Sequence, residues 1–149
     1  MKRSIVALAA LAILSAAAAA SNAAYAAKDS MLGAAMLGAA PERGTGLPSG
    51  QCLRSRDIRN HTIADRNTLL IKGGDKQTYR VTMADGCLAG ANESDPIITR
   101  NPPGADRICK PIDMDIGIAR GGFETRCIVD SIVRLTPEQV AMLPKKLRP

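Results

Sequence analysis

The chain has 149 residues, of which 46% are hydrophobic, and it carries a formal net charge of +6 with four cysteines and one histidine. This length gives a prior expectation of a single domain with a small core. Together these features exclude a polytopic membrane protein, a collagen, a coiled coil and a large multidomain enzyme.

The first 26 residues have the pattern of a secretory signal peptide. Lys2 and Arg3 form a short basic region, an uncharged apolar stretch covers residues 5–20, and Ala24-Tyr25-Ala26 is a small-x-small cleavage pattern. We therefore expect cleavage after Ala26, and a periplasmic or secreted mature chain without a stable membrane anchor. Cleavage after Ala23 and an uncut N-terminal anchor helix are the alternatives.

Residues 27–50 predict a low-complexity linker. The five-residue sequence Met-Leu-Gly-Ala-Ala occurs twice in residues 31–40, a period that matches neither a helix nor a strand. Proline or glycine then recurs every two or three residues up to residue 50. A short helix over residues 31–40 that touches a membrane or a partner is the alternative.

Four widely spaced cysteines predict two structural disulfides in an exported chain. The sequence has no Cys-x-x-Cys motif, which argues against a zinc site or a redox-active pair. Four cysteines allow three pairings. We predict Cys52–Cys127, which would tie the start of the domain to its end, and Cys87–Cys109, which would close the irregular segment between them.

Residues 51–143 predict a mainly β domain, a small antiparallel sheet or partly closed barrel of about five or six strands. Alternation over residues 77–83 places Tyr79 on an apolar face and Thr78 and Arg80 on a wet face. Alternation over residues 112–118 places Ile112 on an apolar face and Asp113 and Asp115 on a wet face. Glycine-rich turns predict two hairpins, one joining 68–72 to 77–83 and one joining 112–120 to 123–135. Residues 96–100 predict an edge strand, and 53–63 fit either a strand or an extended loop.

One short helix is expected near the C-terminus. Thr136 is a good N-cap, Pro137 suits the first helical position, and Gln139 completes a capping box. Pro144 ends the helix after about two turns, and residues 144–149 form a basic tail. A helix this short must dock on the sheet to persist.

The charge of the chain gives no support to nucleic-acid binding. Between residues 52 and 143, 13 Lys and Arg stand against 12 Asp and Glu, so the high isoelectric point reflects the two ends. After cleavage the aromatic residues are Tyr79 and Phe123, too few for a base-stacking surface.

The densest polar cluster holds Arg54, Arg56 and Arg59. Three arginines could clamp a small anion such as a phosphate or carboxylate. The favoured interpretation is structural, with Arg56 and Arg59 pairing with Asp57 and Asp65 to order a loop.

No complete set of nucleophile, base and acid is visible, so the sequence predicts no catalytic residue, no metal site and no cofactor. We expect a non-enzymatic binding or interaction module with an unknown periplasmic partner or a small anionic ligand. The alternative is a small hydrolase-like or accessory enzyme that uses Asp57 with His61, or the pair Asp113 and Asp115.

A set of short motifs resembles an uncharacterised family of small exported proteobacterial proteins, a domain of unknown function. The resemblance spans residues 50–137 and implies export and a compact β domain, with no activity or ligand to carry over. Its motifs are Cys52-Leu-Arg-Ser-Arg-Asp-Ile-Arg, Asp65-Arg-Asn-Thr-Leu-Leu-Ile, Tyr79-Arg, Cys87, Ile108-Cys109, Asp113-x-Asp-Ile and Cys127.

Overall fold

A computed structural model describes residues 41–100 and 104–149. The expected signal peptide, its cleavage site after Ala26 and most of the expected linker lie outside the described residues. Over the described ranges, no helix is long and apolar enough to cross a membrane.

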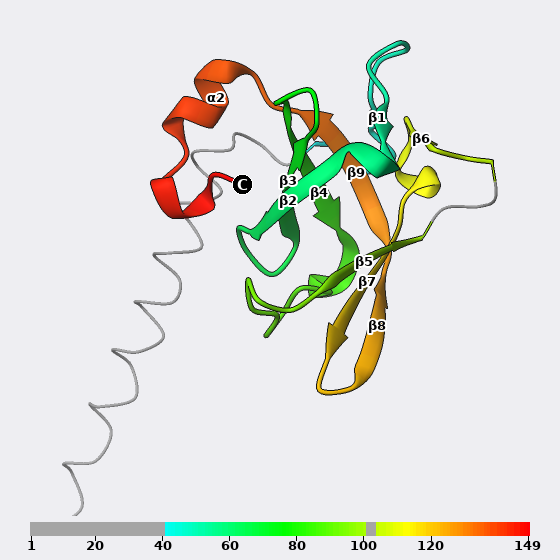
Figure 1. Cartoon of the computed structure of the whole chain (residues 1–149), viewed down its shortest axis with the longest axis vertical. Coiled ribbons are helices and arrows are strands. Elements are labelled where there is room, and N and C mark those ends of the chain that lie inside the picture. The colour runs from blue at the N-terminus through cyan, green and yellow to red at the C-terminus, as the bar shows by residue number, and fades with distance from the viewer. Residues whose placement is uncertain (1–40, 101–103) are drawn as a thin grey trace, which may run out of the picture. The chain divides into compact units, whose positions relative to one another are not determined.

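The described residues form three small antiparallel sheets and one short α-helix, which confirms the mainly β class (Figure 1). They do not close into a barrel. The four-stranded sheet contains β2 (Ile58–Ile63), β3 (Thr68–Gly73), β4 (Thr78–Met83) and β9 (Val129–Arg134), in the order β2-β3-β4-β9. The three-stranded sheet has the order β5-β7-β8, with β5 (Ile97–Arg100), β7 (Asp115–Arg120) and β8 (Phe123–Cys127). The third sheet pairs β1 (Leu53–Arg54) with β6 (Arg107–Ile108).

Both predicted hairpins are present. In the first, β3 pairs with β4, with Ile71 opposite Tyr79. In the second, β7 pairs with β8, with Arg120 opposite Phe123 across the turn at Gly121-Gly122. Both glycines of that turn have positive φ, 58° and 83°, as a two-residue hairpin loop of the primed type requires.

The predicted strand over residues 123–135 is in fact two strands in different sheets. β8 ends at Cys127 and β9 begins at Val129, with the exposed Ile128 between them. Because apolar and β-branched residues run through the junction without a turn signal, the sequence pattern does not reveal the change of sheet.

The predicted strand that begins at Ile112 starts three residues later. Residues Pro111–Asp113 form the 3-10 helix η3, and β7 begins at Asp115. Proline fixes φ near −65°, which suits the first position of such a turn. As a result Ile112, which was expected on the apolar face, is 88% exposed.

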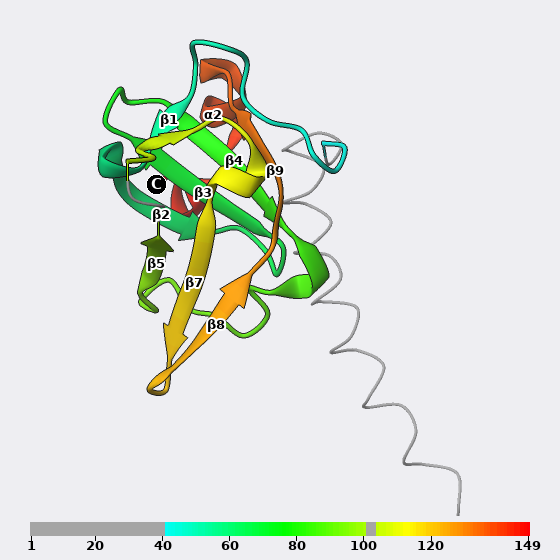
Figure 2. The ribbon, with the colours of Figure 1, turned by 90° about the vertical axis from the view of Figure 1, so that its right-hand side faces the viewer.

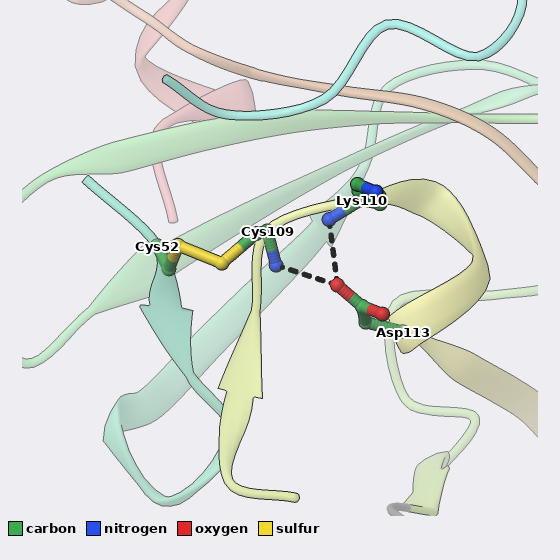
Figure 3. The surroundings of a disulfide bond; sticks show 4 residues. All are labelled: Cys52, Cys109, Lys110 and Asp113. Carbon is green, nitrogen blue, oxygen red and sulfur yellow. Dashed lines mark hydrogen bonds between the residues drawn. A yellow bond between two sulfur atoms is a disulfide. The ribbon is translucent and has the colours of Figure 1, made fainter. Parts of the chain in front are cut away.

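Both predicted disulfide pairings are wrong. The chain forms Cys52–Cys109 and Cys87–Cys127. The pairing of β1 with β6 puts Leu53 opposite Ile108 and so sets Cys52 beside Cys109 (Figure 3). A strand of two residues is too short to show periodicity, so the sequence pattern does not predict that Cys52 and Cys109 are neighbours.

The four-stranded sheet is buried on both faces. One face packs with β5, β7 and β8 in the main core, which includes Leu69, Ile71, Tyr79 and Ile116. A second cluster of Leu70, Leu135, Leu143 and Leu147 covers the other face. Figures 1 and 2 show the C-terminal helix and the three-stranded sheet on different sides of it.

This second cluster corrects the wet face expected for residues 77–83. Thr78 and Arg80 are buried there, because the C-terminal segment lies over them. The segment contains α2 (Pro137–Met142) and the 3-10 helix η4 (Lys145–Leu147). The predicted capping box is present, since Thr136 Oγ1 accepts from Gln139 N and Gln139 Oε1 accepts from Thr136 N.

The packed part of the chain extends beyond residues 51–143 at both ends. Leu47, in the expected linker, is buried in the main core, and Gly44 N donates to the Asp130 carbonyl of β9. Leu147, in the expected tail, is buried, and Arg148 Nε donates to the Leu143 carbonyl.

Candidate functional site

A cavity of about 270 Å³ lies between β2, at the edge of the four-stranded sheet, and β5, at the edge of the three-stranded sheet. We call it the β2–β5 cavity. Its floor is apolar and its rim is polar. The floor residues are Ile58, Leu69, Ile71 and Ile97, and the rim residues are Ser55, Arg59, Asn60, His61 and Thr99.

A β-bulge in β2 shapes the rim. Ile58 pairs with Gly73 and Asn60 pairs with Lys72, so Arg59 is the extra, unpaired residue. Without the bulge, Ile58 and His61 would face opposite sides of the sheet, because side chains alternate along a strand. The bulge lets both line the cavity and turns Arg59 to its edge.

His61 is a half-buried polar residue at the rim of this cavity. It sits opposite Ile71 in the sheet, and its backbone N–H donates to Asn60 Oδ1 at 2.9 Å. Burial lowers the pKa of the His61 imidazole, so the ring is neutral at pH 7. Its Nε2 atom is shielded from solvent, and no described residue hydrogen-bonds to it.

Of the three arginines picked out in the sequence, only Arg59 lines the β2–β5 cavity. All three are exposed, on β1, η1 (Ser55–Asp57) and β2 in turn. The expected ion pairs of Arg56 and Arg59 with Asp57 and Asp65 do not form within the described ranges. Arg54 instead lies opposite another arginine, Arg107, on β6.

The described residues that line the β2–β5 cavity include His61 but no carboxylate, so Asp57 does not face His61 across it as a candidate acid–base pair would. Ser55 lines it, but no hydrogen bond joins the Ser55 hydroxyl to the imidazole. A serine nucleophile would need that bond, and a third group to orient the histidine.

Asp113 and Asp115 lie elsewhere, along a groove of about 640 Å³ that is also lined by the exposed Ile112 and Ile128. The Asp113 carboxylate has a structural role, because its Oδ2 accepts hydrogen bonds from the backbone N–H groups of Cys109, at 3.0 Å, and Lys110, at 2.8 Å (Figure 3). Asp115 pairs with Arg126 at 3.6 Å. The two carboxylates therefore have separate partners.

Sequence reasoning missed several rim residues of the β2–β5 cavity. Asn60 and Thr99 carry no motif, and the bulge that positions Arg59 leaves no periodic signal. For metals, no group of three or more His, Cys, Asp or Glu side chains in the described part of the chain could hold an ion.

A family model described as a family of unknown function (DUF6491) matches residues 1–149. The chain therefore belongs to this family. No curated protein and no solved structure matches it.

Proposed function

We propose that this member of the DUF6491 family is an exported, non-enzymatic binding module that holds a small carboxylate in the β2–β5 cavity. The observation that carries the proposal is that His61 Nε2 is shielded from solvent and has no hydrogen-bond partner among the described residues. The bulge residue Arg59 lies at the same rim. A buried polar atom without a partner costs free energy, and a bound acceptor or donor removes that cost.

Charge favours an anion as the ligand. Among the described residues, the cavity lining contributes the positive Arg59 and no carboxylate. Just outside it, Arg54 lies directly opposite Arg107, a like-charge pair that is unfavourable across two strands. This local excess of positive charge attracts an anion. An arginine can also bind a carboxylate with two parallel hydrogen bonds.

The floor favours a ligand with a short aliphatic part. Leu69 and Ile71 are fully buried below the rim, with Ile58 and Ile97 beside them. Small-molecule sites typically combine such apolar walls with a few polar groups that orient the ligand. We therefore expect the carboxylate to meet Arg59 and His61 while the alkyl chain contacts the isoleucines.

Export is part of the proposal. The basic, apolar and small-x-small pattern of residues 1–26 supports it, as do the two disulfides, which persist in oxidising compartments.

Isothermal titration calorimetry with straight-chain carboxylates, from ethanoate to hexanoate, tests the proposed ligand class. We expect Arg59→Gln to weaken binding at least about tenfold, the equivalent of about 1.4 kcal/mol. Arg54→Gln removes the same charge outside the cavity and serves as the matched control, with a smaller effect. Absence of binding, or equal losses in the two variants, would contradict the proposal.

A further inference from the structure

The outer edge of β8 has no neighbouring strand in the described part of the chain. β8 is the last strand in the order β5-β7-β8, and residues Phe123 to Arg126 are exposed. Both ribbon views show the β7–β8 hairpin projecting past the other strands (Figures 1 and 2). An edge of this kind presents backbone N–H and C=O groups that can pair with another strand.

The hairpin turn decides which backbone groups face outward. Arg120 and Phe123 flank a two-residue loop and form the first hydrogen-bonded pair of the hairpin. Hydrogen-bonded pairs alternate, so Thr125 and Cys127 also bond to β7. The N–H and C=O groups of Glu124 and Arg126 therefore point away from β7, with Cys87 Sγ 3.6 Å from the Arg126 carbonyl oxygen.

We propose that β8 pairs antiparallel with β8 of a second copy of this chain, about a two-fold axis at Thr125. Glu124 then lies opposite Arg126 of the second copy, and the reverse pair forms by symmetry. The outward groups of these residues meet as two hydrogen-bonded pairs, four backbone bonds in all by the antiparallel ladder rule.

Charge selects this register over its neighbours. Sliding one strand by two residues sets Glu124 against Glu124, or Arg126 against Arg126, and like charges directly opposite are destabilising. In the proposed register Glu124 and Arg126 of one copy each meet the opposite charge on the second copy. These contacts add to the ion pairs that Glu124 forms with Arg100, and Arg126 with Asp115, inside each chain.

The proposed dimer also covers an exposed aromatic side chain. Phe123 is 81% exposed in the single chain. In the proposed register it lies opposite Cys127 of the second copy, where its ring gains apolar contact. One short strand pair buries less than the roughly 800 Å² per partner of a typical stable interface, so we expect a weak dimer in rapid exchange.

Cross-linking the full chain tests the register. Thr125 residues facing one another at a non-hydrogen-bonded position have α-carbons about 4.5 Å apart, within disulfide reach. In a glutathione buffer, Thr125→Cys should give a dimer in which peptide mapping finds the introduced thiols of the two copies joined to each other. Ala119→Cys, on β7 of the same hairpin but one strand from the edge, is the control and should stay monomeric.

Sedimentation equilibrium provides a second readout without new thiols. The original chain should show a mass that rises with concentration, and Thr125→Lys, which sets two ammonium groups together at the axis, should stay monomeric with an unchanged melting temperature. Two results together would overturn the proposal. The first is a monomer at every concentration in sedimentation, and the second is cross-linking at residue 125 that is absent or no stronger than at residue 119. Thr125 lies outside the β2–β5 cavity, so carboxylate binding is independent of either result.

Discussion

The carboxyl group of Glu124 lies directly over the α-carbon of Gly117, its diagonal neighbour on the adjacent strand β7. A β-carbon at residue 117 would collide with the Glu124 side chain. Because Gly117 leaves this space open, Glu124 can reach across β7 to Arg100 on β5 and form a two-bond ion pair. A glycine in the middle of β7 thus permits an ion pair between β5 and β8, the two outer strands of the sheet.

We predict that Gly117→Ala lowers the melting temperature of the original chain, because it displaces the Glu124 side chain from Arg100. Overpacking of this kind typically costs about 1–3 kcal/mol. In a Glu124→Ala background the same substitution should instead stabilise by about 0.5–1 kcal/mol, since alanine loses less backbone entropy than glycine. Thermal unfolding of the four proteins of this cycle provides the measurement, and the same sign in both backgrounds would contradict it.

The disulfides should contribute similar amounts to stability. The bridges span 57 and 40 residues, and the chain-entropy model gives about 4 kcal/mol for each. Replacing either pair by alanine should therefore lower the free energy of unfolding by a few kcal/mol in urea titrations. Non-reducing peptide mapping should recover Cys52 linked to Cys109 and Cys87 linked to Cys127. Any other pairing would refute the pairing of β1 with β6 or the position of Cys87 beside the end of β8.

The C-terminal segment should stabilise the domain through Leu147. Leu147→Ala removes a buried side chain from the cluster over Leu70 and should cost about 2–3 kcal/mol. Met142→Ala is the matched control, since Met142 is 57% exposed on the same segment and should cost under about 0.5 kcal/mol. Equal losses in the two variants would mean that residues 143–147 do not pack as described.

His61 should make stability depend on pH. Burial lowers the pKa of its imidazole in the folded state, so below the ordinary value of about 6.5 the unfolded chain binds more protons than the folded one. The free energy of unfolding should then fall as the pH drops from about 6.5 to 5. His61→Gln should flatten that fall in urea titrations across this range. An unaltered pH profile in the variant would show that the imidazole is not shielded.

Local sequence signals located several of the regular elements. The hairpin strands, the edge strand β5 and the capped helix α2 each have a local signal, either alternation or a cap. Tyr79 faces the core as its alternation predicts, and its hydroxyl donates to Asp75 in the hairpin turn.

The remaining features depend on contacts between distant segments. Arg80 is buried because residues 143–147 fold over β4, and nothing near Arg80 in the sequence reports that cover. The disulfide pairing depends on two-residue strands, and the β2–β5 cavity depends on a bulge and on the meeting of two sheet edges. Local patterns carry none of this information, so the sequence does not show that Arg59 and His61 line the same cavity.

The imidazole of His61 provides the most direct test of carboxylate binding in the β2–β5 cavity. It is the only histidine of the chain, so its ring signals in a nuclear magnetic resonance spectrum are unambiguous. Titration of the free protein should give a pKa below about 6.5, because burial disfavours the charged ring. With saturating butanoate the pKa should rise, since a nearby carboxylate favours the protonated form. A His61 pKa that does not change while butanoate is present in excess would contradict the account.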